Sequence, residues 1–181
     1  MKFKIGKILI EIKISFIVFF FIYLFSKSFR NIFYYYFACY MFIMFHEFCH
    51  ILTASLFKYE LNKIEFSMCG MSANLNIDKN KLKNILVFFA GPISNIILAI
   101  IFCNNNFIFN INLVLAILNL IPIFPLDGYR IAKQLNLDTT KFEFIIYVII
   151  VILSILFQNI SFIIFIIYIV FLKNNVKENL L

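Results

Sequence analysis

Six long apolar segments dominate this chain and restrict what it can fold into. They are rich in Ile, Phe, Leu and Val, and they lie at about 14–25, 32–57, 84–103, 107–121, 142–157 and 160–172. Of the 181 residues, 64% are hydrophobic, whereas a soluble domain is usually close to half apolar. Such a chain needs a non-aqueous solvent. The sequence therefore predicts a mainly α-helical membrane protein, a polytopic bundle of about six transmembrane helices.

The basic residues indicate how these helices are oriented. If the amino terminus is cytoplasmic, fourteen of the sixteen Lys and Arg residues fall on the cytoplasmic side, and only Lys27 and Arg30 lie outside. Positive residues collect on the cytoplasmic side of membrane proteins. We therefore expect a multi-pass protein of the cell membrane, with both termini cytoplasmic and the lipid bilayer as a partner. The net charge of +7 follows from this topology and requires no nucleic acid partner.

The longest polar stretch, 58–83, is too short for an independent folded module, so we expect one domain over residues 1–181. Within this stretch, Ile64–Met68 and Met71–Ile77 alternate apolar and polar residues, which predicts a short β-hairpin at the cytoplasmic face. A similar alternation at Ile8–Ile14 predicts a strand. An interfacial coil is the alternative for all three segments.

The three prolines fall in or near potential motifs. Pro92 follows Gly91 at the start of the third segment, while Pro122 and Pro125 interrupt the end of the fourth, just before Asp127. Proline removes a backbone donor, and irregular backbone at membrane depth is tolerated where it is buried in protein or lines a wet cavity. The sequence therefore predicts that residues 119–128 line a cavity.

The two histidines of the chain, His46 and His50, stand in HEFCH, a match to H-E-x-x-H. Four residues along a helix correspond to about 400° and about 6 Å, so both imidazoles share one face. This spacing suits two ligands of one zinc ion, with Glu47 free to act as the general base toward water. The alternative is a metal-free histidine pair that stabilises the bundle, although such groups inside a membrane are costly.

A catalytic zinc needs a third protein ligand. Asp127 follows an apolar run and two prolines, and the predicted topology brings it to the same cytoplasmic depth as HEFCH. Cys49, inside the motif, is a weaker alternative, because a carboxylate suits a hydrolytic zinc better. The other acids lie near loops or span ends among lysines, where solvated or interfacial charge is expected: Glu11, Glu60, Glu65, Asp78, Asp138, Glu143 and Glu178.

Three motifs together resemble the signatures of the site-2 protease family of intramembrane metalloproteases. They are HEFCH at 46–50, AGPISN at 90–95 and NLIPIFPLDG at 119–128, and their order and spacing match those of the family. The resemblance covers nearly the whole chain and is closest to the sporulation-type branch, represented by stage IV sporulation protein FB. That branch has six spans and no PDZ domain, and it releases a sigma factor from its inhibitory pro-sequence. Many of its members carry a cytoplasmic CBS domain, for which only residues 173–181 remain here.

The resemblance implies a zinc metalloendopeptidase with one zinc ion per chain. His46, His50 and Asp127 would bind the metal, and Glu47 would be the catalytic base. Asn119, Pro122 and Pro125 would shape the substrate-facing loop. The third span would support the site through Gly91, Pro92 and Asn95.

The partners expected for such an enzyme are a membrane-associated protein substrate and membrane-bound regulators. A helical substrate hides its carbonyls, so it must unwind locally, and the predicted hairpin could pair with the extended segment. The alternatives are an inactive zinc-binding scaffold and a metal transporter. A transporter would place ionisable residues along a path through several spans, whereas the polar residues here converge near one face.

Overall fold

The computed structural model describes residues 1–5, 8–15, 30–67, 70–75, 80–156, 158, 167, 170 and 173. The described strands are β1 (Lys2–Ile5), β2 (Ile8–Ile12), β3 (Leu61–Ser67) and β4 (Gly70–Leu75). The described helices are α2 (Arg30–Leu56), α3 (Lys81–Ile101), α4 (Asn106–Leu120), α5 (Asp127–Gln134) and α6 (Thr140–Leu156). The chain divides into two compact units, Met1–Ile117 and Leu118–Leu181.

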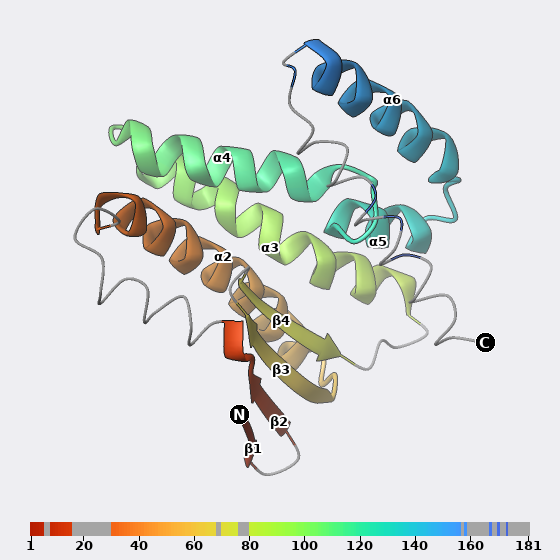
Figure 1. The fold of residues 1–181 in the computed structure, drawn as a ribbon. Helices are drawn as coiled ribbons and strands as arrows, with labels where there is room; N and C mark the ends of the chain where they lie inside the picture. Colours follow the sequence, from red (N-terminus) through yellow and green to blue (C-terminus); the bar gives the residue numbers. More distant parts are fainter. Residues whose placement is uncertain are drawn as a thin grey trace. The chain divides into compact units, whose positions relative to one another are not determined.

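The four strands form one sheet in the order β1-β2-β3-β4 (Figure 1). β1 and β2 pair antiparallel, β2 and β3 pair parallel, and β3 and β4 form an antiparallel hairpin. The predicted hairpin and the predicted strand at Ile8–Ile14 are therefore confirmed as β3, β4 and β2. The additional strand β1 was not predicted.

Charged side chains hold one face of this sheet together. Glu11 and Glu65 lie directly opposite each other on β2 and β3, where two carboxylates repel. The Lys63 ammonium lies 2.7 Å from the Glu11 carboxylate and also pairs with Glu65. Its hydrogen bonds hold the pKa of both carboxyl groups below the ordinary value. Both acids are therefore surface charges paired with lysine, as predicted.

The helices of the first unit alternate in direction. His46 and His50 of α2 contact Asn95 and Val87 of α3 respectively, so these two helices run antiparallel. The rings of Tyr35 and Phe107 meet near the starts of α2 and α4, with centroids 5.1 Å apart. The same alternation of direction is expected of consecutive membrane spans. Strand β4 lies against α2, below α3 and α4 in the view of Figure 1.

Three described helical segments are long and apolar enough to cross a membrane: Tyr34–Leu56, Lys81–Ile101 and Thr139–Leu156. Helix α4 is shorter, at 15 residues, or about 22 Å. These four helices correspond to the predicted segments 32–57, 84–103, 107–121 and 142–157. Large apolar side chains on them are exposed, as lipid-facing residues are. The predicted segments at 14–25 and 160–172 lie almost entirely outside the described residues.

An ion pair between a buried glutamate and a half-buried lysine joins described parts of the second unit. Glu143, in the first turn of α6, is only 4% exposed and pairs with Lys173. The Lys173 ammonium also lies 5.7 Å from the centre of the Tyr129 ring on α5. The prediction of a solvated charge is therefore wrong for Glu143, which is buried and pairs with the half-buried Lys173. Glu60 and Asp138 are exposed, as predicted, whereas Asp78 and Glu178 lie outside the described residues.

Candidate metal centre

Helix α2 presents both histidines on its buried face. His46 is 4% exposed and His50 is 5% exposed, and their ring centroids are 4.7 Å apart. The Nε2 atoms of the two imidazoles face each other at 3.1 Å. The one-face arrangement predicted from the four-residue spacing is therefore present, and two nitrogen atoms that can bind a metal converge at one point.

The second ring nitrogen of each histidine is held by α3. The Nδ1 atom of His50 lies 2.6 Å from the carbonyl oxygen of Val87. A carbonyl oxygen only accepts, so His50 Nδ1–H donates this bond and its Nε2 keeps a lone pair. The Nδ1 atom of His46 lies 3.0 Å from the side-chain amide of Asn95. The contacts at Nδ1 thus hold both rings in an orientation that directs their Nε2 atoms at a common point.

Gly91 lets α3 approach the histidines closely. A Cβ atom added at this position would lie 2.4 Å from His50 Nε2 and 2.5 Å from His46 Nε2. Every residue other than glycine carries that Cβ, so no other residue leaves the space beside the two nitrogens open. Pro92 follows inside the same helix and is fully buried. Gly91 therefore keeps this space free, while the role of the third span in supporting the site stays a prediction.

Glu47 reaches the same space from the next position on α2. A carboxylate oxygen of Glu47 and one ring nitrogen from each of His46 and His50 all lie within 4.8 Å of one another. Glu47 is half-buried, whereas the histidines are buried. Cys49, the weaker candidate ligand, is not part of this group. The described residues of HEFCH thus form a cluster that could hold a metal ion.

The donor set fits zinc. Two nitrogens that each lie about 2.0–2.1 Å from one tetrahedral zinc ion are about 3.3 Å apart. The observed separation between the two Nε2 atoms is 3.1 Å. Zinc-binding histidines also donate the other ring N–H to an acceptor, as His50 does to Val87. His46 and His50 can therefore hold zinc with little rearrangement.

Asp127 is the first residue of α5 and belongs to the second unit. It is 6% exposed, and its carboxylate lies 3.9 Å from the Arg130 guanidinium one turn later. Gly128 fits tightly beside it, because a Cβ there would lie 2.2 Å from the carbonyl oxygen of Leu120. The turn that leads into α5 therefore requires glycine after Asp127. The role of Asp127 as the third ligand stays a prediction.

The residues predicted to shape a substrate-facing loop occupy different local structures. Helix α4 continues to Leu120, so Asn119 lies in its last turn and is half-buried. The non-helical segment is 121–126, in which Pro122 is half-buried and Pro125 is exposed. The break that the two prolines predict is confirmed, although it begins later than position 119. Contact between these residues and a substrate stays a prediction.

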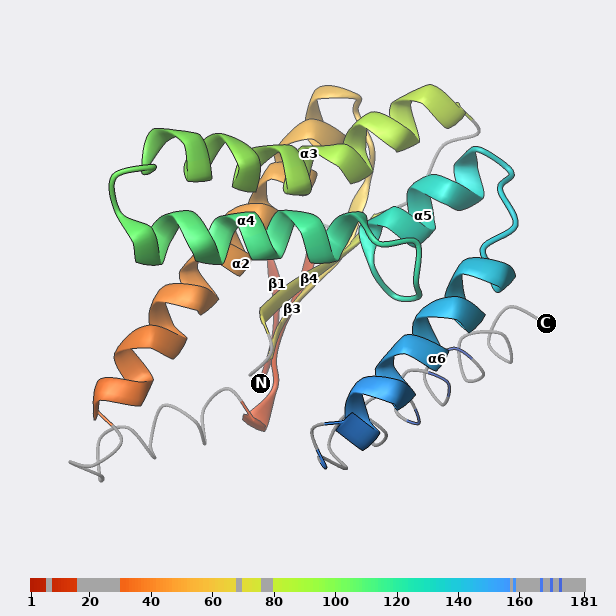
Figure 2. The ribbon, with the colours of Figure 1, turned by 90° about the horizontal axis from the view of Figure 1, so that it is seen from above.

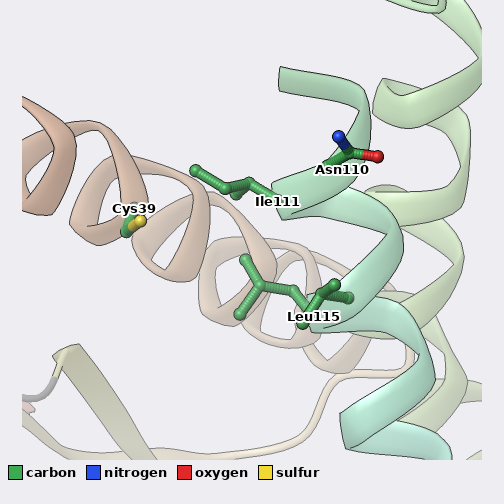
Figure 3. A pocket seen from close by; sticks show the side chains of 5 residues that line it. Cys39, Asn110, Ile111 and Leu115 are labelled. Atoms are coloured by element: carbon green, nitrogen blue, oxygen red, sulfur yellow. The ribbon is translucent and has the colours of Figure 1, made fainter. Parts of the chain in front are cut away.

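A cavity of about 260 Å³ lies between α2 and α4, and neither histidine is among its lining residues. Figure 3 shows Ile111 and Leu115 of α4 directed toward Cys39 of α2, while Asn110 points away from it. The cavity is lined by Cys39, Asn110, Ile111, Val114 and Leu115. Hydrolysis of an amide needs a general base and a group that stabilises negative charge. This lining contains no histidine, carboxylate or basic side chain, so the histidine cluster is the better candidate for a reactive site.

No protein-family model and no curated protein sequence matches this chain. Among solved structures, it is similar to the Site-2 Protease from Methanocaldococcus jannaschii, with a TM-score of 0.61 and 23% sequence identity. The match covers 94% of this chain and 92% of that chain. At this identity, the likeness shows a shared fold. The described chain thus combines a site-2-protease-like membrane fold with a buried cluster of two histidines and a glutamate.

Proposed function

We propose that the chain is an intramembrane zinc metalloprotease that hydrolyses peptide bonds of membrane-associated proteins near the cytoplasmic face. The observation that carries this proposal is the His46–His50 pair, whose Nε2 atoms converge at 3.1 Å with a Glu47 carboxylate oxygen nearby. A buried pair of this kind is costly in a membrane unless it binds a metal or lines a wet cavity. The fold shared with a site-2 protease supports the same function.

Each residue of the centre has a separate task in this proposal. His46, His50 and Asp127 bind zinc, one ion per chain, which supplies a Lewis acid for amide hydrolysis. Glu47 accepts a proton from the attacking water and delivers it to the leaving amine. The first step needs an ionised carboxylate, and the second uses the carboxyl group that the first step has protonated. Glu47 is half-buried, which is compatible with a path for water to this carboxylate.

The substrate must offer an extended segment to such a site. β4 is the last strand in the order of the described sheet, and it lies against α2, the helix that carries the histidines. An edge strand has unpaired backbone groups that can bind an extended peptide. In this proposal, a locally unwound substrate pairs with β4 beside the catalytic helix. Asn119, Pro122 and Pro125 line the path of the substrate.

The placement in the cell membrane leads to a prediction about topology. Since fourteen of the sixteen basic residues fall on one side of the predicted spans, both termini and residues 58–83 should face the cytoplasm. Reporter fusions after residues 80 and 181 should therefore give cytoplasmic signals. An external signal from either fusion would contradict this topology. It would also remove the argument that Asp127 lies at the depth of HEFCH.

Co-expression with candidate membrane-bound pro-proteins tests the proteolytic function. The resemblance of the three motifs to the sporulation-type branch makes a sigma-factor pro-sequence the first candidate. Wild-type protein should shorten the substrate on a gel, and the Glu47→Gln variant should not. An uncleaved substrate that still co-purifies equally with wild-type and variant protein would favour a zinc-binding scaffold instead. Membrane-bound regulators would alter the extent of cleavage in the same assay.

A further inference from the structure

Asn95 contacts the metal centre from α3 and makes an incomplete set of hydrogen bonds. Its side chain is 0% exposed, and its Nδ2 atom lies 3.0 Å from Nδ1 of His46. Its Oδ1 atom is buried without a hydrogen-bond partner among the described residues. Burial of an amide oxygen without a partner costs free energy. One end of the amide thus faces His46 and the other has no partner, so the choice of the atom that faces His46 matters for this candidate ligand.

The observed amide orientation corresponds to a metal-free histidine pair. An amide NH₂ group only donates, so Asn95 Nδ2–H donates to a lone pair on His46 Nδ1. The neutral His46 ring then carries its proton on Nε2. That Nε2–H donates to the lone pair on His50 Nε2, which lies 3.1 Å away. In this tautomer, His46 has no lone pair on Nε2 with which to bind a metal.

A half-turn of the Asn95 amide reverses this situation. The oxygen and nitrogen atoms of the amide exchange places with almost no change in shape. Oδ1 then accepts a hydrogen bond from His46 Nδ1–H, and the lone pair of His46 moves to Nε2. His50 already has the corresponding arrangement, since its Nδ1–H donates to Val87. Both Nε2 lone pairs then face the space that Gly91 keeps open.

We infer that Asn95 is a positioning residue of the metal centre: its Oδ1 accepts a hydrogen bond from His46 Nδ1–H and so holds the tautomer in which His46 Nε2 binds the metal. This inference rests on the proposed zinc chemistry of the same site. Acceptors of this kind orient metal-binding histidines, and their loss typically weakens metal affinity about 10–100-fold. Asn95 acts through His46 and does not contact the metal.

Zinc affinity of the full-length protein in detergent tests the inference. It is measured by competition with a chromogenic chelator, with zinc alone as the ligand. Asn95→Leu removes the acceptor and should weaken zinc binding about 10–100-fold. Asn95→Asp keeps an acceptor and loses the donor, so it should retain affinity close to that of the wild type. If Asn95 instead acted by donating from Nδ2 to His46, Asn95→Asp would lose zinc affinity, because a carboxylate cannot donate a hydrogen bond.

Asn112 provides a matched control on α4. It is also 0% exposed, its Nδ2 donates to the carbonyl oxygen of Ile108, and its Oδ1 has no partner among the described residues. Asn112→Leu should leave zinc affinity unchanged. The inference is overturned if Asn95→Leu binds zinc as tightly as the wild type, or if Asn95→Asp loses affinity 10-fold or more. If Asn95→Leu does not fold, the zinc affinity of Asn95→Asp alone tests the inference. Failure of the wild type to bind zinc would instead refute the proposed function.

Discussion

Replacement of Glu47 by glutamine should abolish cleavage of a membrane-associated substrate while zinc stays bound. His46 and His50 are placed to bind the metal through neutral ring nitrogens, while Glu47 lies one residue, or about 100°, around the helix. Glutamine keeps the size of the side chain and can still hydrogen-bond water. It cannot accept a proton, so the general-base step is lost. The cleavage rate should fall by at least about 10²–10⁴.

Two measurements on the same preparation separate the possible results for this variant. Cleavage is measured by gel shift and zinc by elemental analysis, with Glu60→Gln as a control, because Glu60 is exposed and lies just beyond α2. The control should cleave and bind zinc as the wild type does. Loss of zinc from Glu47→Gln would make Glu47 a ligand and undermine the assignment of Asp127. Cleavage by the variant at a rate near that of the wild type would place the chemistry elsewhere.

Replacement of Gly91 by alanine should remove both zinc and activity, although alanine is the better helix former. The added methyl group would lie 2.4 Å from His50 Nε2 and 2.5 Å from His46 Nε2, in the space proposed for zinc. The histidines or α3 would then have to move. Displacement of catalytic groups by about 1 Å can cost about 10²-fold in rate, and cleavage should fall by at least this factor. Zinc occupancy should fall with it.

Ile93→Ala is the control for Gly91→Ala. Ile93 lies two residues later on α3, and its side chain is exposed, so truncation there leaves the centre unchanged. Helix content measured by circular dichroism should be preserved in both variants, since glycine in a helix is about 0.5–1 kcal/mol less favourable than alanine. Full zinc occupancy in a folded Gly91→Ala variant would show that the metal does not bind between the two Nε2 atoms.

The helix that carries the site is the part of the molecule that sequence predicts best. The long apolar segment around HEFCH predicts the helix, and the period of an α-helix places His46 and His50 on one face. The partner of His50 could not be predicted in the same way. It is the backbone carbonyl of Val87, a group that every residue has, so no side chain marks it. The resemblance of AGPISN to the family motif suggests a supporting role for Asn95. Its contact with His46 is seen only in the structure.

Other features of the fold escaped prediction for physical reasons. β1 consists of four residues with lysine at alternate positions, and basic residues there also fit the flank of a membrane span. β2 pairs parallel with β3, about fifty residues away, and such long-range pairing leaves no local pattern. α5 begins at Asp127 itself and has Gly128 in its first turn, which resembles a loop in sequence. Glu143 resembled a surface charge because Lys173, its partner, is thirty residues later.

Zinc content of the purified wild-type protein in detergent tests the central claim most directly. The account predicts about one zinc ion per chain, because two histidines and one carboxylate make one site. His46→Ala and Asp127→Ala should each lower this occupancy, measured by elemental mass spectrometry on the same amount of folded protein. A wild-type protein that carries no transition metal, even after zinc is supplied, would contradict the account of this site as a metal centre.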